Sequence, residues 1–143
     1  MKKIILILLI IGSISSKGLS QSADQKELHK VVIQLNTADT AAWSSTIGNI
    51  KNLHKIWPNK INIEVVVHGK GLDLLVTTKT HLANDVVDLS KLGVVFAACE
   101  NSMRKHNINK ADLLPVAVTV PSGVAELVLK QEVGWSYLKA SVN

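Results

Sequence analysis

The chemistry of this chain centres on its single thiol, Cys99, which lies between two segments of different pattern. An apolar run at residues 94–98 precedes the cysteine, and a polar, helix-like stretch at residues 100–106 follows it. This order predicts that Cys99 lies where a strand ends and a helix begins. The first turn of a helix offers unpaired backbone N–H groups and a partial positive charge. Both favour the thiolate, which is the nucleophilic form of cysteine, so Cys99 is the candidate catalytic residue.

Small polar residues, glycines and one histidine follow the apolar runs, and they are the candidate binding residues. They are Asn36, His68, Gly69, Asn101, Ser102, Ser122 and Gly123. Ligands of parallel sheets bind beyond the carboxyl ends of the strands, so we expect these residues to gather near the thiol. His68 is the candidate base. Structural roles compete with these functional ones, because a free cysteine can act as a small buried hydrophobe and Ser122 can cap a helix.

Apolar, β-branched runs alternate with segments of helical periodicity along the chain. We expect strands near residues 31–35, 61–67, 94–98, 116–120 and 135–139. We expect helices near residues 40–57, 71–92 (in one or two pieces), 100–106 and 123–133, with a short helical piece within 107–114. Asp39 or Thr40 could cap the first helix, and Gly93 and Gly134 could end two others. Such alternation predicts a single, doubly wound α/β domain with a mostly parallel five-stranded sheet.

The first 20 residues have the order of a secretory signal peptide. A positive start precedes an apolar run at residues 4–11, and small and polar residues lead to Ser20. A membrane-spanning helix needs about 20 apolar residues, so we expect export to the periplasm or the medium without a stable membrane anchor. Residues 21–29 are polar and predict a flexible lead-in, which leaves residues 30–143 for the α/β domain.

Composition argues against several classes of function. Removal of the signal would take away three lysines and no acid, so the formal net charge would fall from +5 to +2. Neither a basic cluster nor a group of aromatic side chains indicates nucleic-acid binding. The five histidines lack metal-ligand spacing, and the chain lacks a dinucleotide or phosphate-binding loop, so we expect no metal and no cofactor. One cysteine excludes an intrachain disulfide.

Four segments of the chain together resemble the DsrE/DsrF-like family, and more narrowly its small exported members. They are residues 96–103, 108–115, 120–127 and 131–137. The resemblance covers residues 30–140 and implies a flavodoxin-like fold, assembly into homotrimers or hexamers, and a role in sulfur handling. In sulfur-relay members a cysteine carries sulfane sulfur as a persulfide, and Cys99 occupies the matching position. Glu100 stands where many exported relatives have glycine, and its charge favours a higher pKa for the neighbouring thiol.

Two functional hypotheses follow for Cys99. In the first, the protein is an exported, sulfurtransferase-like sulfur carrier, which exchanges sulfur with a donor or acceptor protein and uses His68 as a proton shuttle. This hypothesis requires a sulfur atom that solvent can reach. In the second, the chain is a non-catalytic oligomeric module that binds a small ligand or a partner, and Cys99 is structural. A redox sensor that pairs Cys99 between subunits is a weaker third reading.

Overall fold

The computed structural model describes residues 28–141, so the predicted signal peptide and most of the predicted lead-in lie outside the described residues. These residues form one five-stranded sheet with the order β4-β3-β2-β1-β5. The strands are β1 (His29–Leu35), β2 (Ile61–Val67), β3 (Val95–Cys99), β4 (Val118–Val120) and β5 (Ser136–Lys139). Every strand pairing is parallel. The predicted α/β fold is therefore confirmed, and the sheet is parallel throughout.

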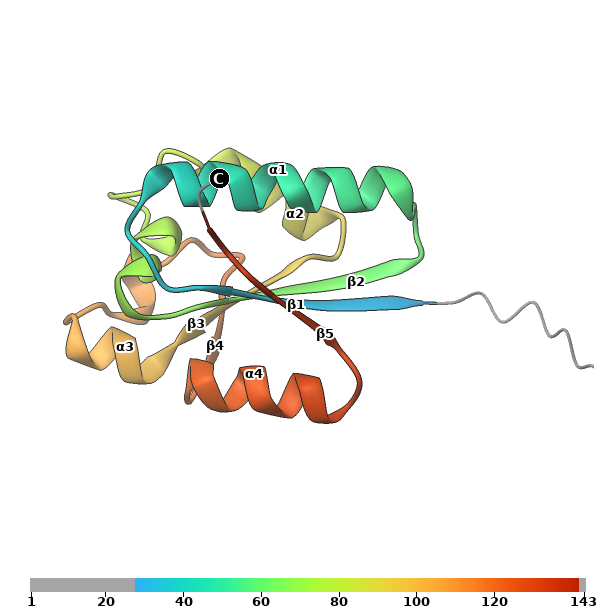
Figure 1. Ribbon diagram of the computed structural model, residues 1–143. Helices are drawn as coiled ribbons and strands as arrows, with labels where there is room; N and C mark the ends of the chain where they lie inside the picture. The colour runs from blue at the N-terminus through green and yellow to red at the C-terminus, as the bar shows by residue number, and fades with distance from the viewer. Residues whose placement is uncertain (1–27, 142–143) are drawn as a thin grey trace, which may run out of the picture.

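Helices cover both faces of the sheet (Figure 1). Helices α1 (Thr40–Ile56) and α2 (Ala83–Lys91) lie on one face, and α4 (Gly123–Glu132) lies on the other. The short α3 (Glu100–Lys105) follows directly from the end of β3, and the 3₁₀ segments are η1 (Gly69–Leu75) and η2 (Lys110–Asp112). Within the described part of the chain, none of these helices has the length and apolarity that a membrane crossing needs.

Local signals in the sequence set most element boundaries. The Asp39 carboxylate accepts a hydrogen bond from the N–H of Ala41 at 2.8 Å, so Asp39 is the cap of α1. Gly93 and Gly134 follow α2 and α4 with φ of 92° and 83°, values that favour glycine after a helix. The segment 71–92 splits into η1 and α2 because Val76 is extended and forms an isolated bridge with Leu113. Strand β4 is shorter than predicted because Ala117 closes a turn onto the carbonyl of Leu114.

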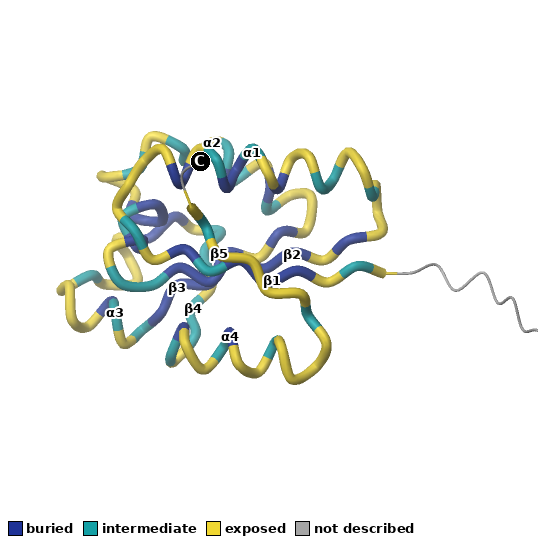
Figure 2. Tube along the Cα trace, in the orientation of Figure 1, coloured by how far each residue is buried: buried dark blue, intermediate teal, exposed yellow. Residues whose placement is uncertain are grey.

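The two faces of the sheet have cores of unequal size. The buried positions concentrate in the strands, between the two layers of helices (Figure 2). Under α1 and α2, a large cluster includes Ile33, Val65 and Phe96, all of which are fully buried or nearly so. Under α4, the buried apolar residues are Val32, Val66 and Leu127. Side chains alternate between the two faces along a strand, so the face under α4 also carries the polar residues of β1 and β2. The thiol and its neighbours belong to this more polar face.

A buried ion pair ties α4 to the sheet. Glu64 on β2 is 4% exposed, and its carboxylate lies 2.6 Å from the ammonium group of Lys130 on α4. Glu126 lies 3.5 Å from the same ammonium group, which is also 4.5 Å from the ring centre of Trp135. Burial raises the pKa of Glu64, although Lys130 acts in the opposite direction. This pair fixes the position of the helix whose first turn reaches the thiol.

Candidate functional site

Cys99 is the last residue of β3 and the residue that caps α3, as its place in the sequence predicts. Phe96 and Ala98 point into the large core under α1 and α2. Because side chains alternate along a strand, Cys99 faces the other side of the sheet, toward the start of α4. The residue is 4% exposed. The expectation that solvent reaches the sulfur is therefore wrong for the single chain, in which two helix starts cover the thiol.

Hydrogen-bond donors surround this buried thiol. Burial by itself raises the pKa of Cys99, but hydrogen bonding to the Ser102 hydroxyl and to the backbone N–H groups of Gly123, Ser102 and Asn101 lowers it. The net effect lowers the pKa below the ordinary value of a cysteine. Glu100 is not among these causes. The N–H groups come from the first turns of α3 and α4, where a helix leaves its donors unpaired. The site can therefore hold a sulfur anion in a buried place.

Ser102 links the thiol to the end of the neighbouring strand. Its hydroxyl oxygen accepts a hydrogen bond from the N–H of Gly69 at 2.9 Å. The Ser102 oxygen accepts in this bond, so its O–H proton can be donated to the sulfur of Cys99. Gly69 has φ of 54° and begins η1 directly after His68. The contact thus aligns the starts of η1 and α3 around Cys99.

Gly123 allows α4 to begin directly over the site. A Cβ atom at this position would lie 3.1 Å from the Cβ of His68 and 3.2 Å from the Cβ of Cys99. It would also lie 3.2 Å from a methyl group of Val66. Only a residue without a side chain fits here without displacing its neighbours. This close packing brings three of the predicted residues, Gly123, His68 and Cys99, together at one point.

His68 is held by a residue that sequence reasoning missed. Its Nε2 atom lies 2.8 Å from the side-chain nitrogen of Gln34 on β1, and the Gln34 oxygen accepts a hydrogen bond from the Tyr137 hydroxyl on β5. Burial lowers the pKa of His68, which favours a neutral ring. The available signal was Gln34 itself, the one polar residue in the apolar run at residues 31–35. The sequence pattern does not single out Tyr137, and in the structure its strand is exposed throughout.

Three of the predicted residues direct their side chains elsewhere. Asn36 is exposed, and its backbone carbonyl rather than its side chain lies near Gly69. Asn101 contributes a backbone N–H to the thiol, while its side-chain oxygen accepts a hydrogen bond from Arg104. The Ser122 hydroxyl accepts a hydrogen bond from the N–H of Ala125 at 3.4 Å. The helix-capping reading of Ser122 is therefore correct.

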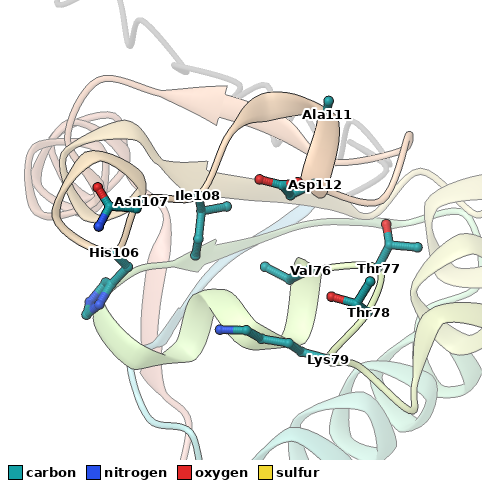
Figure 3. A pocket seen from close by; sticks show the side chains of 9 residues that line it. All are labelled: Val76, Thr77, Thr78, Lys79, His106, Asn107, Ile108, Ala111 and Asp112. Carbon is teal, nitrogen blue, oxygen red and sulfur yellow. The ribbon is translucent and has the colours of Figure 1, made fainter.

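A separate pocket of about 440 Å³ lies away from the thiol, between residues 76–79 and 106–112 (Figure 3). Lys79, His106 and Asp112 contribute its charged or titratable groups, and none of the predicted site residues lines it. Among residues 28–141, no three His, Cys, Asp or Glu side chains gather in a way that could hold a metal ion. The thiol with its donors therefore remains the site to which the sequence points.

Comparison with known proteins agrees with this architecture. The model of the DsrE/DsrF-like family matches residues 15–140. The chain belongs to this family. No curated protein matches the sequence significantly.

Solved structures show the same DsrE-like fold. The protein of unknown function MTH1491 from Methanobacterium thermoautotrophicum is 32% identical, with a TM-score of 0.74 over 78% of this chain and 98% of that chain. BT1422 from Bacteroides thetaiotaomicron, also of unknown function, is 16% identical, with a TM-score of 0.60 over 77% and 93%. The ychN protein from E. coli is 14% identical, with a TM-score of 0.61 over 78% and 99%. The last two likenesses concern the fold alone.

Proposed function

We propose that this DsrE/DsrF-like protein is a sulfur carrier, sulfurtransferase-like in its chemistry, that holds sulfane sulfur as a persulfide on Cys99. The observation that carries the proposal is the donor set around one thiol, which lowers its pKa despite burial. A thiolate is the form that attacks sulfur, and the same donors suit the anion of a persulfide. The signal-like order of residues 1–20 supports action in the periplasm or the medium, where a donor or acceptor protein exchanges the sulfur.

The loading step is an exchange of one sulfur–sulfur bond for another. The Cys99 thiolate attacks a sulfur atom of a polysulfide, so that one S–S bond forms and one breaks. The electron pair of the broken bond leaves with a shorter polysulfide anion, and the step needs no external oxidant or reductant. Because Cys99 is 4% exposed, the donor reaches the sulfur only after a local opening at the start of α3 or α4.

Mass spectrometry of the intact protein tests this function. After treatment with inorganic polysulfide, we expect a mass gain of about 32 Da for each added sulfur, which dithiothreitol removes. The Cys99→Ser variant, close in volume, is expected to fold with nearly unchanged thermal stability and to gain no mass. A wild-type chain that never gains sulfur would show that the thiol is not a carrier.

A non-catalytic oligomeric module that binds a small ligand or a partner is the second candidate, and the burial of Cys99 favours it. In that case a thiol reagent would label Cys99 only after the protein has been denatured. Labelling of the native protein at neutral pH would favour the carrier, because a reactive thiol must open to its reagent. A large loss of stability in Cys99→Ser would also favour the structural role.

Self-assembly into a homotrimer or hexamer is part of the proposal. Large apolar side chains are exposed on α4 and β5, beside the smaller core. They are Val124, Val128 and Leu129 on α4, Val133 directly after this helix, and Tyr137 on β5. Apolar patches of this kind mark interaction surfaces, and we propose a second copy of the chain as the occupant.

A further inference from the structure

A row of polar side chains crosses the sheet and ends at the thiol. Tyr137 on β5 pairs with Val32, two residues before Gln34 on β1. Gln34 in turn pairs with Val66, two residues before His68. Side chains two residues apart share one face of a sheet, and diagonal neighbours on adjacent strands are within reach of long side chains. Val67 pairs with Ala98, so His68 and Cys99 follow side by side at the carboxyl edge.

In the structure, the Gln34 amide turns its oxygen toward Tyr137 and its nitrogen toward His68. The Tyr137 hydroxyl donates to the amide oxygen. The amide nitrogen, 2.8 Å from His68 Nε2, carries only donors. In this orientation the amide nitrogen donates to the lone pair of Nε2, and a neutral ring with a lone pair on Nε2 carries its proton on Nδ1.

We propose that Gln34 and Tyr137 are positioning residues, which hold His68 beside Cys99 as the neutral Nδ1–H tautomer, so that the lone pair of Nε2 is occupied and the ring does not act as a base in the Cys99 site. This inference rests on the proposed function and replaces the role of proton shuttle predicted for His68. It also assigns a function to β5, an edge strand whose side chains are all exposed.

The electrostatic surroundings of His68 agree with a neutral ring. On this face, the titratable groups are Tyr137 and Lys139 on β5, Cys99 on β3, and the Glu64 pair with Lys130 and Glu126 farther along the sheet. The cause that lowers the pKa of His68 is burial, with no contribution from a charged neighbour. Likewise, His68 is not among the groups that lower the pKa of Cys99.

Nitrogen-15 NMR of the full-length, ¹⁵N-labelled protein at pH 7 tests the tautomer directly. In the wild type we expect about a tenfold excess of the Nδ1–H form, the ratio that one hydrogen bond can sustain. Gln34→Glu should protonate both ring nitrogens, because a carboxylate accepts from Nε2–H and raises the pKa of His68. Tyr137→Phe should reduce the excess about twofold, and Ser136→Ala on the same strand should leave it unchanged. A dominant Nε2–H form in the wild type would overturn the proposal.

The pH dependence of Cys99 alkylation supplies a second readout. His68→Asn should keep this profile, because the wild-type thiol has no ion pair with His68 to lose. A shift of the profile to higher pH in His68→Asn would show a thiolate–imidazolium pair and would also overturn the proposal. Neither measurement involves sulfur loading. A chain that shows the Nδ1–H form and gains no polysulfide mass would refute the sulfur-carrier function and support the tautomer.

Discussion

At the scale of single residues, hydrogen-bond donors around Cys99 lower the pKa of its thiol. Ser102 contributes twice, through its hydroxyl and through its backbone N–H. The hydroxyl also accepts a hydrogen bond from the N–H of Gly69, so this side chain links the starts of α3 and η1. A thiol that is buried without such donors has a raised pKa and is inert.

Replacement of Ser102 by alanine is expected to raise the pKa of Cys99. Less thiolate is then present at pH 7, so alkylation by iodoacetamide should slow about three- to tenfold, in line with the loss of one hydrogen bond. The alkylation rates of the variant and the wild type should converge at a pH above the pKa of Cys99 in both proteins. A pH series of alkylation rates measures this, with the α1 variant Ser44→Ala as the control. Equal profiles for Ser102→Ala and the wild type would contradict the role of the hydroxyl.

Linkage gives the sign of the accompanying stability effect. Because folding lowers the pKa of Cys99, the thiolate stabilises the fold at a pH above the unfolded pKa, and this contribution is lost as pH falls through the folded pKa. We expect the free energy of unfolding of the wild type, relative to Cys99→Ser, to rise with pH through this window. Urea unfolding of both proteins from pH 6 to pH 10 measures it, and a difference that does not change with pH would contradict the lowered pKa.

At the scale of elements, the position of α4 decides the site. Gly123 sets how closely its first turn approaches Cys99. The pair of Lys130 with buried Glu64 holds the rest of the helix against β2. These two contacts can be tested separately, because one is steric and the other electrostatic.

Gly123→Ala is expected to move the start of α4 away from the sheet. The added Cβ atom would lie within 3.2 Å of His68, Cys99 and Val66, so we expect a loss of about 1–3 kcal/mol in stability and a higher pKa for the thiol. Gly48→Ala on α1 is the matched control. Nothing lies within 4 Å of its new atom, and it should stabilise the protein by about 0.5–1 kcal/mol. Urea unfolding and alkylation of both variants measure these effects, and a neutral Gly123→Ala would contradict the close packing.

Lys130→Met would leave the Glu64 carboxylate buried without its cation. We expect a loss of about 3 kcal/mol at pH 7, as for other broken buried pairs. Burial raises the pKa of Glu64, and the loss of Lys130 would raise it further. The variant should therefore recover stability as pH falls and the carboxyl takes up a proton. Lys91→Met, which breaks an exposed pair with Asp88, should cost less than about 1 kcal/mol across the same pH series.

At the scale of the whole molecule, the two faces of the sheet are unequal. The face under α1 and α2 holds the large core, whereas the face under α4 holds a small apolar core and the polar residues of the site. The exposed apolar side chains of α4 and β5 adjoin this second face. Assembly through them would bury apolar surface that the single chain leaves in water.

Val128→Asp is expected to reduce the assembled mass toward that of one chain, because a buried, unpaired carboxylate opposes association. Light scattering coupled to size-exclusion chromatography measures the mass. Ile56→Asp, at the end of α1 and 64% exposed, is the matched control and should leave the mass unchanged. A wild-type protein that elutes as a monomer would contradict assembly.

The amino-acid sequence by itself determined the order of strands and helices, because alternating apolar runs and helical periodicity are local patterns. It also determined the junction at Cys99, the caps at Asp39 and Ser122, and the helix-ending glycines. The tertiary structure alone decided that Gln34 and Tyr137 hold His68, that Gly123 brings a second helix to the thiol, and that both helices bury it. Those contacts join residues far apart in the chain, and they depend on strand order and register, which local residue patterns do not specify.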